Sequence, residues 1–122
     1  MSQNPQAEQA ALKTIDSMIA RCEKARPKFA QGTSQHSLLK NRVKALRIAR
    51  GLLQGDAGAY GREELEAALA PVRSIIHKCQ TARRKYPPGS SLYRRFTPMI
   101  DAMSLAEGRI LAEIEKNQTA GF

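Results

Sequence analysis

The amino-acid sequence predicts an all-α protein, a four-helix up-down-up-down bundle built from two tandem helical hairpins. The composition is rich in strong helix formers such as Ala, Leu, Lys, Arg and Glu, and runs of β-branched residues are absent. Apolar residues recur at helical spacing, and the second half of the chain repeats the first. At 122 residues the chain has the length of one domain, which we place at 1–122.

The repeat is the strongest of these observations. When the chain is shifted by 57 residues, AALKTIDSMIARCEKARPKFAQGTS at 10–34 lies over AALAPVRSIIHKCQTARRKYPPGSS at 67–91 without a gap. The identities extend through the glycine and serine of the turn, which similarity between two unrelated helices would seldom match. They indicate one supersecondary unit used twice, with pseudo-twofold symmetry between the copies. The expected first unit, linker and second unit are about 7–54, 55–61 and 62–117.

The first and third helices are predicted at about 7–29 and 62–86. Each carries one apolar stripe at spacings of three, four and seven residues, so each has one face to bury. The acids of REELEAAL at 62–69 suit the first turn of the third helix, where they favour the positive end of the helix dipole. The two stripes are Leu12, Ile15, Ile19, Cys22 and Phe29, and Leu69, Val72, Ile76, Cys79 and Tyr86.

The second and fourth helices are predicted at about 35–54 and 91–117, after the turns Gly-Thr-Ser and Gly-Ser-Ser. The hydroxyls of Ser34 and Ser91 are expected to cap them, because a side-chain oxygen there accepts from an unpaired backbone N–H. Each helix again carries a single apolar stripe. These stripes are Leu39, Val43, Leu46 and Leu53, and Phe96, Ile100, Met103, Ile110 and Ile114.

Prolines and glycines interrupt the helical pattern. Pro27, Pro71 and Pro98 predict kinks or, at Pro98, a fresh helix start capped by Thr97. A glycine inside a helix costs about 1 kcal/mol, so we expect a packing reason for Gly51 and Gly108. Small residues one turn apart allow neighbouring helices to approach closely; they are Ala45, Ala49, Ala102 and Ala106.

The net charge of +9 and a pI near 10.1 predict attraction to anionic partners such as nucleic acid or acidic protein. No apolar run approaches the roughly 18 residues that a membrane span requires, and MSQNPQAEQAALK does not resemble a secretory signal. We therefore expect a cytoplasmic protein without membrane insertion. Two cysteines outside a Cys-x-x-Cys spacing fit a reducing compartment.

An up-down-up-down bundle would place both hairpin turns at one end and the linker and termini at the other. Basic and aromatic residues cluster toward the expected turn end, and acids toward the opposite end, which predicts an electrical dipole. Helix N-termini favour anions, and rings beside basic side chains can stack bases. The candidate anion-binding or nucleic-acid-binding residues are Arg26, Lys28, Arg83, Arg84, Lys85, Ser90, Ser91, Tyr93, Arg94 and Arg95. The alternative is an ordinary set of helix caps with a solvated basic rim.

A second basic group lies on the second helix, which has no acid between Gln35 and Gln54. Lys40, Lys44 and Arg47 share one face of it and are candidate binding residues too. The corresponding positions of the second unit carry no basic residue. A solvated helix face is the alternative interpretation.

No constellation of residues indicates catalysis. Cys22 and Cys79 occupy equivalent stripe positions, and we expect small buried hydrophobic residues near the pseudo-twofold axis. His77 lies two residues from Cys79 and therefore on a different helix face, and no His, Cys or acid set has a metal spacing. Nucleotide-loop, zinc-protease and hydrolase motifs are absent. We therefore predict no catalytic residue, metal or cofactor.

The expected function is non-catalytic binding of an anionic partner, with the nucleic-acid backbone favoured over acidic protein, through the basic turn end. A protein-interaction or scaffolding module is the alternative, either as a homo-oligomer or as a subunit of a larger assembly. An enzyme or binder acting on a small phosphorylated ligand is the third. The sequence does not decide between RNA, DNA and acidic protein.

Overall fold

The structure is a computed structural model that describes residues 5–56 and 58–120. It contains four α-helices and, in those residues, no strand. The helices lie close to their predicted positions, with a short 3₁₀ helix after the first. They are α1 (Pro5–Ala25), η1 (Arg26–Lys28), α2 (Ser34–Leu53), α3 (Arg62–Arg83) and α4 (Ser91–Ala120). The all-helical fold class is confirmed.

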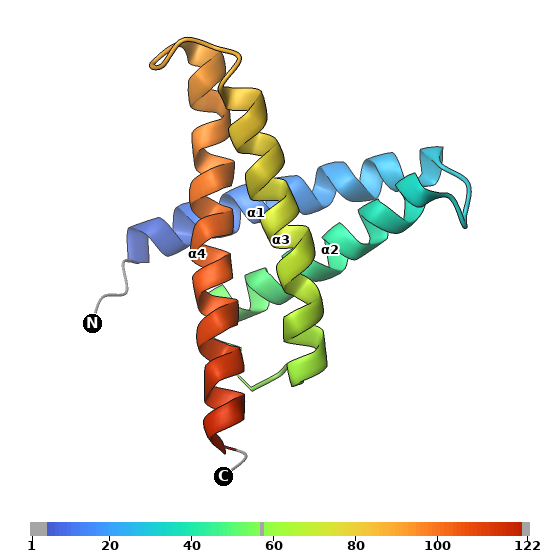
Figure 1. The fold of residues 1–122 in the computed structure, drawn as a ribbon, viewed down its shortest axis with the longest axis vertical. Coiled ribbons are helices and arrows are strands. Elements are labelled where there is room, and N and C mark those ends of the chain that lie inside the picture. The colour runs from blue at the N-terminus through green and yellow to red at the C-terminus, as the bar shows by residue number, and fades with distance from the viewer. Residues whose placement is uncertain (1–4, 57, 121–122) are drawn as a thin grey trace.

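The helices form two antiparallel hairpins that lie across each other (Figure 1). α1 and α2 make one arm, and α3 and α4 make the other. The α1–α2 turn and the α3–α4 turn lie at the tips of different arms, so the expectation that both turns share one end of the bundle is wrong. α2 packs on both α3 and α4, and α1 packs on α4, so the apolar stripes meet where the arms cross.

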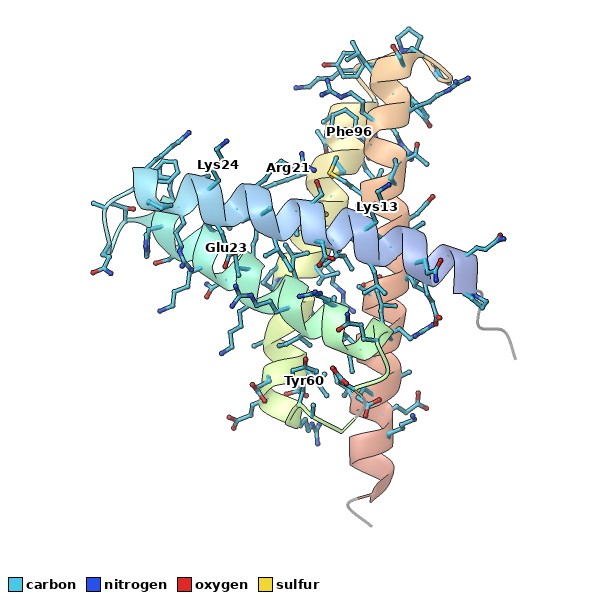
Figure 2. All side chains as sticks on the ribbon, turned by 180° about the vertical axis from the view of Figure 1, so that it is seen from behind. Lys13, Arg21, Glu23, Lys24, Tyr60 and Phe96 are labelled. Atoms are coloured by element: carbon cyan, nitrogen blue, oxygen red, sulfur yellow. The ribbon has the colours of Figure 1, made fainter. Side chains whose placement is uncertain are left out.

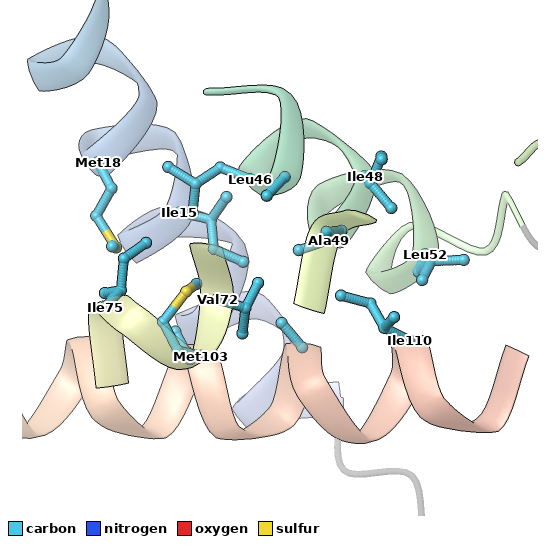
Figure 3. Packing of buried hydrophobic residues seen from close by; sticks show 14 of the residues in the cluster. Ile15, Met18, Leu46, Ile48, Ala49, Leu52, Val72, Ile75, Met103 and Ile110 are labelled. Carbon is cyan, nitrogen blue, oxygen red and sulfur yellow. The ribbon is translucent and has the colours of Figure 1, made fainter. Parts of the chain in front are cut away.

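Side chains from all four helices fill the core at this crossing (Figure 3). Ile15 of α1, Leu46 of α2, Val72 of α3 and Met103 of α4 are completely buried. They form two pairs, Ile15 with Val72 and Leu46 with Met103, whose members are 57 residues apart. The predicted alanines Ala45, Ala49, Ala102 and Ala106 are almost completely buried. Side chains this small permit a short distance between crossing helices.

The stripe prediction fails at the tip of the α1–α2 arm. Phe29 was placed in the buried stripe of the first helix, but its side chain is 39% exposed. The crossing lies near the middle of the hairpins, and the α1–α2 tip extends away from the other arm (Figure 1). A residue there has no second hairpin to pack against, although helical periodicity continues to its position.

The two turns make the same backbone hydrogen bonds. The amide of Phe29 donates to Arg26, and that of Tyr86 donates to Arg83, each over 3.1 Å. Gly32 and Gly89 both adopt the left-handed conformation, with φ of 88° and 86°, which glycine reaches without a Cβ penalty. Further equivalent bonds join Thr33 to Ala30 and Ser90 to Pro87, and Ser37 to Thr33 and Arg94 to Ser90.

The helix caps lie one residue earlier than predicted. Thr33 Oγ1 accepts from the amide of His36 at 3.3 Å, and Ser90 Oγ accepts from the amide of Tyr93 at 3.2 Å. Ser34 and Ser91 are the first helical residues instead. The cap residue needs extended backbone geometry, and in each turn it directly follows the left-handed glycine.

The prolines behave differently from one another. α1 ends at Ala25, and Pro27 lies in the 3₁₀ helix, where its missing N–H is tolerated. α3 and α4 continue through Pro71 and Pro98. The alternative of a fresh helix start at Pro98 is therefore wrong, because α4 already begins at Ser91.

The predicted packing reason exists for only one of the two helical glycines. A methyl group added at Gly51 would overlap the hydroxyl of Tyr60 from the linker, whereas one added at Gly108 would meet nothing within 4 Å. Among the helices described, none is long and apolar enough to cross a bilayer.

Candidate anion-binding site

The predicted binding residues fall into three groups rather than one. Arg26 and Lys28 lie at the α1–α2 tip, in the 3₁₀ helix. Lys40, Lys44 and Arg47 lie along α2. The remaining group, from Arg83 to Arg95, lies at the tip of the other arm (Figure 1). Because the two tips are on different arms, the three groups do not form a single surface.

Part of the basic face of α2 is paired with acids of α1. Arg47 forms an ion pair with Glu23, and Arg50 forms one with Asp16 at 2.9 Å. These acids were not visible to reasoning about α2 alone, because they come from the partner helix of the hairpin. Lys40 and Lys44 make no ion pair with any residue that the structure describes. The α2 face is therefore less positive than its sequence indicates.

The positive charge at the tip of the α3–α4 arm is not neutralised by nearby acids, unlike part of the charge on α2. The chain has no acid between Glu66 and Asp101. Arg84, Lys85, Arg94 and Arg95 make no ion pair within the described part of the chain. This tip therefore carries the densest unpaired positive charge found among the predicted groups.

Two contacts that involve aromatic rings lie near the base of the same tip. The guanidinium of Arg83 lies 4.8 Å from the centre of the Tyr93 ring, within cation–π range. Tyr86 and Phe96 stack with their ring centres 6.3 Å apart and their planes 15° apart. Ser90 uses its hydroxyl to cap α4, so its oxygen already has a structural role.

A groove of about 550 Å³ lies where α1 crosses the α3–α4 arm. We call it the crossing groove; it is lined by Lys13, Thr14, Ser17, Arg21, Tyr86, Leu92, Arg95, Phe96, Pro98 and Met99. Figure 2 shows Lys13 and Arg21 on α1 and Phe96 on the arm that α1 crosses. Three basic side chains, two hydroxyls and the stacked ring pair thus border one hollow, and none of these described lining residues is acidic.

Sequence reasoning identified only Arg95 among the three cations of this groove. Lys13 and Arg21 lie far along the chain from either turn, and only the crossing of the hairpins brings them beside Arg95. Neither Lys13 nor Arg21 makes an ion pair with the rest of the described chain. The sequence shows only that both residues lie on the polar side of the α1 stripe. Their place beside Arg95 becomes visible only once the crossing of the hairpins is known.

A second, smaller pocket of about 250 Å³ contains both cysteines. We call it the thiol pocket and define it by Cys22, Cys79, Arg21, Arg42 and Lys78. Burial raises the pKa of both thiols, and the nearby guanidinium groups of Arg42 and Arg21 oppose this shift. The thiols are therefore largely protonated at neutral pH.

The cysteines do not form a disulfide in this arrangement. They are free, and no Cα of α1 lies within 8 Å of a Cα of α3 in the described residues. A disulfide requires a Cα separation below about 7 Å. The expected meeting of Cys22 and Cys79 is thus limited to lining one pocket. Among the described side chains, no group of three His, Cys, Asp or Glu residues is placed to hold a metal.

Comparison of the chain with protein-family models, with curated proteins and with solved structures finds no significant match.

Proposed function

We propose that this protein is a non-catalytic nucleic-acid-binding protein and that the crossing groove and the α3–α4 tip form its interface. The observation that carries this proposal is the crossing groove. It combines the stacked rings of Tyr86 and Phe96 with three cations that form no ion pair among the described residues, Lys13, Arg21 and Arg95. Cations contact backbone phosphates, and aromatic faces stack on bases.

The ring pair favours nucleic acid over an acidic protein. A patch of lysine and arginine alone attracts either partner, because the attraction is electrostatic and non-specific. Tyr86 and Phe96 are only partly buried and border the groove. A base in the groove could stack on them while its phosphates pair with the flanking cations. An acidic side chain has no flat ring to use this surface.

We also infer that the two hairpins are copies of one duplicated unit related by a pseudo-twofold axis. The inference is supported by the equivalent turn hydrogen bonds and by the buried residues that recur 57 positions apart. The thiol pocket supports it further, because Cys22 with Cys79 and Arg21 with Lys78 are equivalent pairs that line one hollow. A pocket on the inferred axis would be lined by such pairs. The cytoplasmic location and the absence of catalysis remain predictions from the sequence.

The proposal is tested by fluorescence anisotropy of a labelled mixed-sequence oligonucleotide over a series of salt concentrations. We expect tight binding at low salt that weakens as salt rises, since phosphate contacts release counterions. The double variant Lys13→Ser/Arg95→Ser should reduce the magnitude of the slope of log K against log salt by about 1.4 to 1.8. Replacing Arg83, Arg84, Arg94 and Arg95 by Ser should weaken binding most.

The matched control is Arg62→Ser/Lys116→Ser, which removes the same charge from the opposite end of the α3–α4 arm. This variant should keep the wild-type slope. Equal losses in both double variants would mean that net charge alone acts, and the crossing groove would not be the interface. Wild-type protein that shows no salt-dependent binding would overturn the proposed function.

A further inference from the structure

All the charged side chains that line the thiol pocket are positive. Arg21 of α1, Arg42 of α2 and Lys78 of α3 line it, and none of the residues described around it is acidic. None of the three makes an ion pair inside the described part of the chain. Glu23, an acid next to Cys22 on α1, pairs with Arg47 instead. Three cations from three helices thus converge on one hollow without a counter-charge.

Arg42 is the central member of this group. Its Nε is buried and donates to no acceptor in the described structure. Arg21 and Lys78 are more exposed and lie at the rim. A buried donor left unsatisfied costs about 1–3 kcal/mol, and more when the group is charged. An acceptor in the pocket would remove this cost.

The inferred duplication indicates that this position does not need an arginine for packing. Its equivalent in the second hairpin is Met99, which lines the same pocket. Methionine has a similar volume and fills such a position without charge. An arginine at one of two otherwise equivalent places therefore adds a positive charge and a fork of N–H donors rather than volume.

We propose that the thiol pocket binds a phosphate group, held by Arg42 with Arg21 and Lys78. Arginine matches the geometry of a phosphate with paired N–H donors. The largely protonated thiols of Cys22 and Cys79 add two weak donors and no competing negative charge. Since water takes about 30 Å³ in the liquid, a hollow of about 250 Å³ has room for a five-atom oxyanion.

The phosphate can come from two sources, free inorganic phosphate or a nucleic-acid strand. The thiol pocket shares Arg21 and Met99 with the crossing groove, so a strand in the groove would bring its phosphates close to Arg42. Binding of inorganic phosphate does not depend on the proposed nucleic-acid function. The two proposals can therefore fail separately.

The first experiment is thermal unfolding in chloride buffer with inorganic phosphate added at constant ionic strength. We expect phosphate at ten times its Kd to raise the Tm of the wild-type protein by about 5 °C. Arg42→Met, which copies the second hairpin, should lose this shift and have an equal or higher Tm in chloride. The control Lys24→Met removes an exposed charge outside the pocket and should shift as the wild type does.

A second readout uses the wild-type chain and does not rely on the variant folding. Alkylation of Cys22 and Cys79 by iodoacetamide should slow several-fold when phosphate occupies the pocket, because the anion blocks access and disfavours the thiolate. Protection by inorganic phosphate assigns the site to the free ion. Protection by an oligonucleotide but not by inorganic phosphate assigns it to a strand.

The proposal is overturned if neither inorganic phosphate nor an oligonucleotide slows alkylation of the wild-type thiols. It is also overturned if Arg42→Met folds and responds to phosphate as strongly as the wild type. Protection of the thiols with no oligonucleotide binding at the crossing groove would support the phosphate site and reject the proposed function.

Discussion

Two interfaces join the hairpins, α2 with α3 and α1 with α4, and they differ in chemistry at positions that the proposed duplication makes equivalent. Where α2 packs on α3, Leu52 and Leu65 are buried apolar residues. Where α1 packs on α4, the residues at the equivalent positions 57 away are Arg109 and Glu8. These two form an ion pair whose side chains are only 22% and 18% exposed. One interface thus uses a charged pair at the place where the other uses leucines.

This difference shows which positions the crossed fold depends on. At the centre of the crossing both halves keep the same kind of residue, such as Ile15 with Val72 and Ala49 with Ala106. At Leu52 and Leu65 on one side and at Arg109 and Glu8 on the other, apolar or charged residues are compatible with helix packing. A well-packed apolar pair often stabilises a protein as much as a partly buried ion pair, since ions lose hydration. We therefore expect the residues at these positions to be exchangeable between the two interfaces.

Apart from truncation of a core leucine, breaking the ion pair on one side should have the greatest effect on stability. Glu8→Leu leaves Arg109 without its partner in a mostly buried place, and should lower the free energy of unfolding by about 1–3 kcal/mol. Glu8→Leu/Arg109→Leu makes the α1–α4 interface resemble the α2–α3 interface, and should be as stable as the wild type or more so. Urea unfolding of both variants measures the two values.

A double variant as unstable as the single one would contradict the prediction that leucines can replace the ion pair. It would mean that the α1–α4 interface cannot accommodate leucines at these positions. The two interfaces would then differ in packing as well as in chemistry. The control is Leu65→Ala in the α2–α3 interface, which should cost about 2–5 kcal/mol as a buried core truncation.

The sequence predicts the helices and the centre of the core well, because both are local or periodic properties. The stripes through Ile15, Leu46, Val72 and Met103 identify the faces that become buried, and the turn glycines mark the helix boundaries within a few residues. The crossing of the hairpins is not local. It depends on how side chains of different size fit between helices, and a stripe is compatible with aligned or crossed packing.

The candidate site was only partly predicted for the same reason, because it also depends on how the hairpins cross. Arg83, Arg94 and Arg95 were identified because they are close together along the chain. Lys13 and Arg21 were missed because they join Arg95 only through the crossing. The charge of α2 was overestimated for a related reason, since the acid that pairs with Arg47 comes from another helix. Proximity in space has to be known before unpaired charge can be recognised.

Alanine substitution at the two helical glycines should change the stability by a smaller amount and in opposite directions. Gly51→Ala should lower the free energy of unfolding by about 1–2 kcal/mol, because the added methyl group displaces the Tyr60 ring. Gly108→Ala meets no neighbouring atom within 4 Å, and should raise it by about 0.5–1 kcal/mol through improved helix propensity. Urea unfolding distinguishes the opposite signs. Equal effects would mean that Tyr60 does not pack against α2.

The smallest expected effect tests the ion pairs within each hairpin. Asp16 pairs with Arg50 at 2.9 Å in the first hairpin, and Arg73 pairs with Glu107 at 2.6 Å in the second. The two pairs lie 57 residues apart in the sequence, with the charges reversed. Reversed order preserves the attraction between the helices, so the position requires opposite charges rather than a particular acid or base.

Asp16→Arg should therefore lower the free energy of unfolding by about 0.2–1 kcal/mol, because it places two exposed positive charges together. Adding Arg50→Glu reproduces the order of the second hairpin and should restore the wild-type value. Both differences should shrink at 1 M salt, where charges are screened beyond about 3 Å. If the double reversal remains as unstable as Asp16→Arg alone at low salt, then Asp16 acts through a contact other than Arg50, and the two hairpins use this position differently.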